Sequence, residues 1–523
     1  MNKFFWTFLG LWLLLPAWPL LAANVLANPG FESNVPGQTT DIPSWNAYGG
    51  NAYLLTNTAI AHDGTNYFKV YQAFTGATKN TGIYQDYISG PGAVYSASGW
   101  AYTSADDTLA GHNAAWIEVT FRDASAHILT LYRSAMITTN TIADKAFPVG
   151  VWINLPVTNQ YNPVSLQFSN SVSQLVAPAG TYFVRYQVNF LGDAQYSGGS
   201  VYFDDLNLSP TGGAPYGNWN IAWSDEFNGS SLNPQTWTYD LGNGSGGWGN
   251  NELEDYTSSA ANSHVSGGCL HIVAQKQSAG GQNYTSARIK SEGLFSFQYG
   301  RLEWRAQLPN GVGFWPALWT LGTNITGIGW PGCGEMDVVE NNGGVPGTVQ
   351  GSLHSGSDET AVYNFLNGDS VTNFHTYTLD WGTNAILFYV DGHLYESQTN
   401  WSSTVGAYPI PFNQPFFIIM NLAVGGNYLG NPGTNTINTS SFPGEMLVDY
   451  VRIYRQTAPL QISISRTNSS AALNWPGGIV CHLQAQTNSL VSQNWSDFAG
   501  ITNPVVIVPN PNNGSVFYRL ESP

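Results

Sequence analysis

The acidic residues of the segment 334–340, which reads Gly-Glu-Met-Asp-Val-Val-Glu, are of the right type to transfer protons and to attack a carbon atom. Acidic and apolar residues alternate in this segment, which predicts a β-strand with Glu335 and Asp337 on one face and the apolar side chains in a core. Strict alternation would turn Glu340 to the opposite face. One extra residue, a β-bulge at residues 338–339, would return Glu340 to the acidic face.

With the bulge, the Cα atoms of Glu335 and Glu340 would lie about 13 Å apart, at roughly 3.3 Å per residue. Their side chains can lean toward each other and leave on the order of 5 Å between the carboxyl groups, the separation expected of a retaining glycosidase. The negative charge of Asp337 would keep Glu340 protonated until it delivers its proton. The alternative is a solvated edge strand, but three acids on one face without a basic partner would repel one another. We therefore favour catalysis.

Residues 330–340, Trp-Pro-Gly-Cys-Gly-Glu-Met-Asp-Val-Val-Glu, resemble the signature of glycoside hydrolase family 16, in the form with the extra residue found in laminarinases and agarases. Further segments match the laminarinase pattern in the same order, at residues 223–227, 247–253, 286–289, 313–319, 421–426 and 449–454. The resemblance covers essentially all of residues 215–455. It implies a β-jelly-roll (a concanavalin-like sandwich) with a concave cleft, and it implies Glu335 as the nucleophile, Asp337 as its hydrogen-bonded helper and Glu340 as the acid/base.

The same resemblance implies a set of substrate-binding residues, because a sugar cleft needs aromatic plates and neutral polar partners. These residues are Asn251, Glu252, Arg288, Trp315, Trp330 and His354. Each tryptophan could instead pack in the core, and we favour sugar contact for Trp315 and Trp330 and core packing for Trp319. Arg288 could equally be an ion-pair partner of a cleft acid, and His354 could be a buried, satisfied histidine.

Members of this family often carry a structural calcium ion on the convex face. The resemblance places its ligands at Glu226, Asp449 and the backbone carbonyl of Gly268. Oxygen donors of this kind suit calcium, although the two acids could also be ordinary surface residues. No cofactor is expected for the reaction itself.

Composition limits the binding partner. Charged residues make up 9% of the 523 residues, aromatic residues make up 14%, and the net charge is −17. Nucleic acid is therefore excluded as a partner, because phosphate binding needs clustered Lys and Arg. No Lys or Arg occurs between Arg305 and Arg452, so a site in that stretch would bind a sulfated polymer poorly. The expected partner is a neutral polysaccharide, and we expect a monomer.

The N-terminus predicts export. A single Lys is followed by an apolar stretch from residue 4 to about 21 and then by Ala22 and Ala23, which is typical of a cleaved signal peptide over residues 1–23. The alternative is a signal anchor, but Pro16 and Pro19 interrupt a stretch that is already short for a membrane span. The mature protein is expected to be secreted and extracellular, with the periplasm and the cell surface as alternatives, and without membrane contact after cleavage.

The rest of the chain indicates an all-β protein in three parts. Short aromatic or β-branched segments are bounded by Gly, Asn, Asp or Pro throughout, and no long helical periodicity is evident. Pro/Gly-rich breaks divide the chain into residues 24–210, a linker at 211–215, a catalytic region at 216–455 and a small C-terminal β-module of unknown role at 459–523. Residues 24–210 resemble β-sandwich carbohydrate-binding modules, with Trp45, Tyr48, Trp100 and Tyr102 as possible stacking residues or core residues.

Cysteine usage adds little. Cys269, Cys333 and Cys481 are too few and too scattered for a disulfide framework, and their spacing does not match a zinc site. One disulfide is possible, with the third cysteine free or buried.

The sequence thus predicts an endo-acting β-1,3-glucanase of the laminarinase type that works by double displacement. One alternative is cleavage of another neutral polymer, agarose or a mixed-linkage β-glucan, by the same groups. A second alternative is a non-catalytic β-glucan-binding protein, but relatives of that kind lack the paired glutamates that this chain has.

Overall fold

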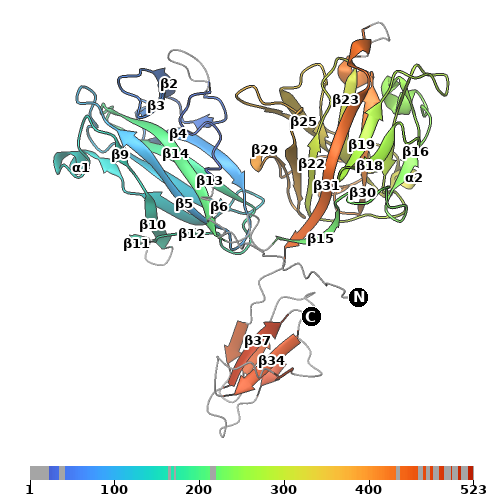
Figure 1. Cartoon of the computed structure of the whole chain (residues 1–523). Coiled ribbons are helices and arrows are strands. Elements are labelled where there is room, and N and C mark those ends of the chain that lie inside the picture. The colour runs from blue at the N-terminus through green and yellow to red at the C-terminus, as the bar shows by residue number, and fades with distance from the viewer. Residues whose placement is uncertain are drawn as a thin grey trace, which may run out of the picture.

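The computed structural model describes residues 23–33, 42–162, 167–169, 172–212, 219–430 and 436–456, together with six strands between residues 463 and 521 (Figure 1). Most described elements are strands in antiparallel sheets, as the short β-rich segments predicted. Cys481 and the predicted signal peptide, apart from Ala23, lie outside these residues. Among the described residues, no helix combines the length and apolar character needed to cross a membrane.

Residues 46–212 form an N-terminal β-sandwich. Its first sheet is ordered β12-β5-β14-β3-β2, with β9 paired to β5. The strands of this sheet are β2 (Ala52–Thr56), β3 (Asn66–Tyr71), β5 (Val94–Tyr102), β9 (Ile153–Asn154), β12 (Leu175–Val176) and β14 (Ser200–Gly212). Along β5, buried and half-buried residues alternate strictly, as expected for a strand with one face on a core.

The second sheet of this sandwich is ordered β11-β10-β7-β6-β13-β4, with β1 on β4 and β8 on β6. Its strands are β1 (Asn46–Tyr48), β4 (Lys79–Ile88), β6 (Ala114–Arg122), β7 (Ile128–Ser134), β8 (Ile137–Thr138), β10 (Val157–Asn162), β11 (Gln167–Ser169) and β13 (Phe183–Gly192), and the short helix α1 (Thr139–Ala143) follows β8. Fully buried residues such as Phe68, Phe121 and Phe203 fill the core between the two sheets.

Residues 219–456 form a second and larger sandwich. Its inner sheet is ordered β16-β21-β30-β23-β24-β25-β26. The strands are β16 (Thr238–Asp240), β21 (Arg288–Lys290), β23 (Phe314–Gly322), β24 (Glu335–Glu340), β25 (Thr348–His354), β26 (Asp358–Asn364) and β30 (Phe416–Val424). Every residue of β23 and β30 is buried, because one face of the sheet packs on the core and the other is the floor of a cleft.

The outer sheet covers the back of the inner one. It is ordered β29-β28-β27-β22-β31-β19-β18, with β15 on β31. Its strands are β15 (Trp219–Asp225), β18 (Ser263–Ser266), β19 (Cys269–Ala274), β22 (Gly300–Gln307), β27 (His375–Trp381), β28 (Ile386–Val390), β29 (His393–Gln398) and β31 (Gly444–Gln456). The core between the sheets includes Trp304, Trp381 and Phe388, which are almost completely buried.

Short elements join these sheets. They are the parallel pair β17 (Glu254–Tyr256) and β20 (Tyr284–Ser286), the helix α2 (Ile325–Ile328) and the single turns η1 (Gly247–Asn251), η2 (Asn427–Leu429) and η3 (Thr439–Ser441). Cys269 and Cys333 both carry free thiols.

The two sandwiches are joined side by side through an apolar contact. Strand β4 of the N-terminal sandwich meets β29 of the second one, where the backbone N–H of Ile88 donates to the carbonyl of Gly392 at 2.6 Å. Ile88 and Phe183 pack there against Leu387 and Tyr389, and all four side chains are buried. Because β29 is the edge strand of the outer sheet and β1 pairs with β4 only at residues 82–84, the contact also covers two stretches of strand that would otherwise be open to pairing.

Two small three-stranded sheets lie in the C-terminal part (Figure 1). One is ordered β32-β33-β36 and the other β35-β34-β37. Their strands are β32 (Ser463–Arg466), β33 (Ala471–Asn474), β34 (His482–Thr487), β35 (Ser496–Asp497), β36 (Val505–Ile507) and β37 (Val516–Glu521).

Candidate active site

Strand β24 contains the bulge that the sequence predicted. Leu318 of β23 pairs with Val339, but the next residue of β23 pairs with Asp337, so Val338 is an extra residue on β24. The register with β25 shifts at the same place. Both valine side chains are buried, and Glu340 returns to the face that carries Asp337. The prediction of a bulge at residues 338–339 is confirmed.

Glu335, Asp337 and Glu340 line one cleft of about 670 Å³ on the open face of the inner sheet. A cleft of this size matches the range found for small-molecule and sugar sites. The three carboxyl groups therefore converge on one space, which a solvated edge strand would not produce.

Glu340 is set up to hold a proton. Its side chain is 8% exposed, and the indole Nε1 of Trp315 donates a hydrogen bond to its Oε1 at 2.9 Å. Burial, together with the negative charge of Asp337, raises the pKa of Glu340 to about 8, although the Trp315 hydrogen bond opposes the rise. At neutral pH this carboxyl group is mostly protonated, as a general acid must be.

A second group of charged residues surrounds His354, near the Glu335 end of β24. His354 lies between two carboxylates, with its Nε2 3.2 Å from Asp337 Oδ2 and its Nδ1 2.7 Å from Asp358 Oδ1. Burial lowers the pKa of His354, but the hydrogen bond and charge of Asp337 and the charge of Glu335 outweigh it and raise the pKa to about 10. The imidazole is therefore a cation at neutral pH.

The positive charge of His354 lies close to Glu335. One ligand-type atom from each of Glu335, Asp337 and His354 lies within 4.8 Å of the other two. Burial and the repulsion of Asp337 raise the pKa of Glu335 well above its usual value, and the positive charge of His354 opposes part of this rise. His354 is thus a contact that favours the anionic form of Glu335, whereas burial and the charge of Asp337 favour the protonated form of Glu340.

The structure brings five of the six predicted substrate-binding residues to the cleft. They are Glu252, Arg288, Trp315, Trp330 and His354. Trp330 is 58% exposed, which leaves its ring free to stack on a sugar. Asn251 is the exception, because its exposed side chain donates to Asn427 Oδ1 at 2.9 Å and its neighbours line the cleft instead.

Two of the predicted side chains also have structural contacts. Glu252 is 5% exposed and accepts a hydrogen bond from the Tyr256 hydroxyl at 2.8 Å. Arg288 forms an ion pair with Asp240 at 2.9 Å, and its guanidinium lies 4.8 Å from the ring centre of Trp248. Asp240 does not line the cleft, so this ion pair lies outside it, and the charge of Arg288 also acts to lower the pKa of the cleft residue Glu335.

Sequence reasoning missed several residues of the cleft. Trp319, which was assigned to the core, is buried but lines the cleft floor, where its Nε1 donates to Asn421 Oδ1 at 2.7 Å. Tyr428 stacks on Trp315 with ring centres 5.1 Å apart, and Trp248 adds a further aromatic plate. Alternation along β23 could have found Trp319, because it lies two residues from Ala317, which lines the cleft as well.

Glu226 and Asp449, two of the three residues predicted to bind calcium with Gly268, are paired with arginines. Arg452 donates to both carboxylate oxygens of Glu226, at 2.9 and 2.8 Å, and Arg305 donates to Asp449 at 2.6 Å. A calcium ion would have to displace both guanidinium groups, so this arrangement does not fit a bound calcium ion as it stands. Calcium binding therefore stays a prediction and enters no step of the chemistry below.

Known proteins match the region that holds this site. The model of the glycosyl hydrolases family 16 matches residues 251–441. The beta-glucanase of Rhodothermus marinus is 40% identical over 260 residues, which are 45% of this chain and 85% of that protein. A glucan endo-1,3-beta-glucosidase of Cryptopygus antarcticus is 36% identical over 231 residues, or 41% of this chain and 84% of that protein.

A longer relative matches across a wider region. The glucan endo-1,3-beta-glucosidase A1 of Niallia circulans is 37% identical over 303 residues, which are 53% of this chain but only 44% of that protein. Because this chain covers most of the length of relatives at 36% and 40% identity, and because the family model spans the bulged acidic strand, the chain belongs to glycosyl hydrolases family 16.

Proposed function

We propose that the chain is a secreted, endo-acting β-1,3-glucanase of the laminarinase type, with a jelly-roll catalytic domain, that cleaves its substrate with retention of configuration. The observation that carries this proposal is the bulged strand β24, which brings three carboxyl groups into one cleft. The similarity to glucan endo-1,3-beta-glucosidases supports the choice of β-1,3-glucan among neutral polysaccharides.

In the first step, the Glu335 carboxylate attacks the anomeric carbon while Glu340 transfers its proton to the leaving glycosidic oxygen. The bond between the anomeric carbon and that oxygen breaks, and a glycosyl ester of Glu335 forms. In the second step, Glu340, now a carboxylate, takes a proton from water. The water oxygen attacks the anomeric carbon, the ester breaks, and Glu335 and the protonated Glu340 are restored.

The neighbouring residues act by position and charge. His354 stabilises the anionic form of Glu335 before attack, and Asp337 holds His354 in place through their 3.2 Å ion pair. Trp315 stabilises the anionic form of Glu340 that exists between the two steps, because its N–H donates to the same carboxyl group. Trp315 and Trp330 supply the aromatic plates for sugar rings.

The absence of basic residues between Arg305 and Arg452 supports a neutral substrate over a sulfated one. We further propose that the mature chain is a monomer, that its N-terminal sandwich is a carbohydrate-binding module, and that residues 1–23 direct export. Mass measurement of the exported protein would test the cleavage site and the oligomeric state.

The test of the activity is a substrate panel. The purified chain is incubated with laminarin, lichenan, agarose and κ-carrageenan, and reducing ends are measured. We expect laminarin to be cut fastest. Release of sugar from agarose or lichenan alone would replace the substrate by one of those polymers. Binding of laminarin without any cleavage would favour a non-catalytic glucan-binding protein.

A further inference from the structure

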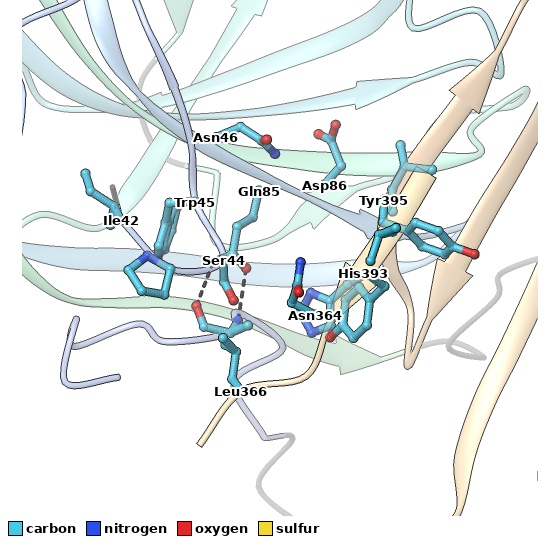
Figure 2. A pocket seen from close by; sticks show the side chains of 15 residues that line it. Ile42, Ser44, Trp45, Asn46, Gln85, Asp86, Asn364, Leu366, His393 and Tyr395 are labelled. Carbon is cyan, nitrogen blue, oxygen red and sulfur yellow. Dashed lines mark hydrogen bonds between the residues drawn. The ribbon is translucent and has the colours of Figure 1, made fainter. Parts of the chain in front are cut away.

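A second cavity lies at the junction of the two sandwiches, outside the catalytic cleft. It has a volume of about 590 Å³, and both domains line it. Ser44, Asn46 and Asp86 come from the N-terminal sandwich, whereas Asn364 and Tyr395 come from β26 and β29 of the catalytic sandwich. Figure 2 shows these side chains around one space, with Asn46 and Asp86 on one side and Asn364 and Tyr395 on the other.

A polysaccharide bound in the catalytic cleft would extend toward this cavity. Glu335 and Glu340 are placed along one strand, and in the proposed mechanism they act on opposite sides of the scissile bond, so the sugar chain must cross β24 rather than follow it. On one side of β24 the inner sheet continues, in the described part of the chain, through two strands, β25 and β26. Because neighbouring strands lie about 4.8 Å apart, the edge of the sheet is about 10 Å from the reacting carbon.

The cleft and the junction cavity meet on neighbouring strands. Gln350 of β25 lines the catalytic cleft, Val362 of β26 lines the junction cavity, and these two residues are direct partners in the sheet. Asn364 lies two residues further along β26 and therefore points to the same face as Val362. Val362 is 51% exposed, so solvent reaches the surface of the sheet at this position.

The lining of the junction cavity suits a neutral polar ligand. Within the part of the lining that the structure describes, Asp86 is the only carboxylate, and Arg185 donates to both of its oxygens at 2.7 Å. No Lys or Arg is among the described residues that line the cavity, and burial lowers the pKa of the lining residue His393 to about 4, so that it is neutral at pH 7. The exposed side chains of Ser44 and Asn46 offer hydroxyl and amide groups of the kind that hydrogen-bond sugar hydroxyls.

The cavity is also held open by rigid elements. Tyr395 packs edge-on against Tyr363 with ring centres 5.8 Å apart, which supports the catalytic side of the cavity. The backbone bond between Ile88 and Gly392 and the buried cluster around Leu387 hold the other domain in place. A ligand that enters this space meets preformed walls and orders little of the protein on binding.

We infer that the junction cavity is a distal subsite for the neutral polysaccharide chain as it leaves the catalytic cleft over β26. The N-terminal sandwich then forms part of the substrate path of the enzyme, in addition to any separate binding surface. This inference rests on the proposed function, because it takes its ligand from the reaction assigned to the cleft.

The test compares substrates of different length. The full chain and its Asn46→Ala/Asn364→Ala variant are assayed on laminarin and on a laminari-oligosaccharide too short to extend past β26. We expect kcat/KM on laminarin to fall about tenfold, the effect of losing two neutral hydrogen bonds, and kcat/KM on the short substrate to stay unchanged. Asn140→Ala, an exposed asparagine on α1, is the matched control and should change neither value.

The outcomes separate the two proposals. Equal losses on the long and short substrates, or no loss on laminarin, would overturn the distal subsite. The two single variants, Asn46→Ala and Asn364→Ala, should each give part of the loss on laminarin, and a null result in both would also overturn it. If the unaltered chain cleaves neither substrate, the proposed function itself fails, and the variants then carry no further weight.

Discussion

The hydrogen bond between Trp315 and Glu340 should influence the pH dependence of catalysis in a way that can be measured. The indole N–H donates to Glu340 Oε1 at 2.9 Å in a buried setting. A hydrogen bond to a charged group contributes about 1.5–3 kcal/mol and one to a neutral group about 0.5–1.5 kcal/mol, so this bond favours the carboxylate by about 1.4 kcal/mol. That difference corresponds to about 1 pH unit in the ionisation of Glu340.

Trp315→Phe removes the donor and keeps an aromatic ring in the cleft. Glu340 must be protonated to act as the acid, so activity is present below its pKa of about 8 and is lost as the pH rises through it. Loss of the hydrogen bond raises the pKa of Glu340, and the alkaline limb of the pH profile of kcat/KM should therefore move up by about 1 pH unit. The assay is laminarin cleavage from pH 5 to 10.

Trp330→Phe is the matched control. Its ring also lines the cleft and is 58% exposed, but no carboxylate accepts a hydrogen bond from it among the contacts of the described residues. We expect a higher KM in this variant with the alkaline limb unmoved. An unmoved or lowered limb in Trp315→Phe would refute the assignment of Glu340 as the acid under the control of this bond.

Three other changes have expected outcomes. Glu335→Gln should abolish reducing-end release while leaving laminarin binding intact by calorimetry, and undiminished turnover would exclude Glu335 as the nucleophile. His354→Gln removes the cation that lowers the pKa of Glu335, so the acidic limb of the kcat/KM profile should move to higher pH. The loss of kcat/KM should be at least about tenfold greater at pH 5 than at pH 8. An equal loss at both pH values would assign His354 a steric role only. Leu387→Ala opens a cavity in the domain contact and should lower the free energy of unfolding by about 2–4 kcal/mol in urea titrations of the full chain, whereas a cost below about 0.5 kcal/mol would mean that the contact does not form.

Most of the catalytic strand could be predicted because its information is local. The pattern of acidic and apolar residues over 334–340 sets which side chains face the core, and the count of residues between Glu335 and Glu340 requires the bulge that the structure contains. The pKa values depend on partners that the local pattern does not reveal. Trp315 and Asp358, for example, reach Glu340 and His354 from other strands of the sheet.

The walls of the cleft were only partly predictable for the same reason. Trp319 follows the alternation of the cleft-facing residues of β23, but it is also buried, as a core residue would be. The sequence pattern alone was consistent with either position. Tyr428 lies in a short turn after β30 and stacks on Trp315 of the neighbouring strand β23. Asn251 was placed in the cleft through a motif whose neighbouring residues line it instead. Side chains on loops depend on how each loop folds over the sheet, which period-2 alternation does not describe.

By itself, the sequence determined the β-rich architecture, the acidic strand with its extra residue, and the absence of basic residues over 306–451, because each of these is a property of residue types and short spacings. Only the tertiary structure decided that Tyr87 of β4 meets His393 of β29 and that a cavity forms between the domains beside the edge of the catalytic sheet. These contacts join residues that are hundreds of positions apart, and they arise where two exposed strand edges and two apolar surfaces happen to match in shape.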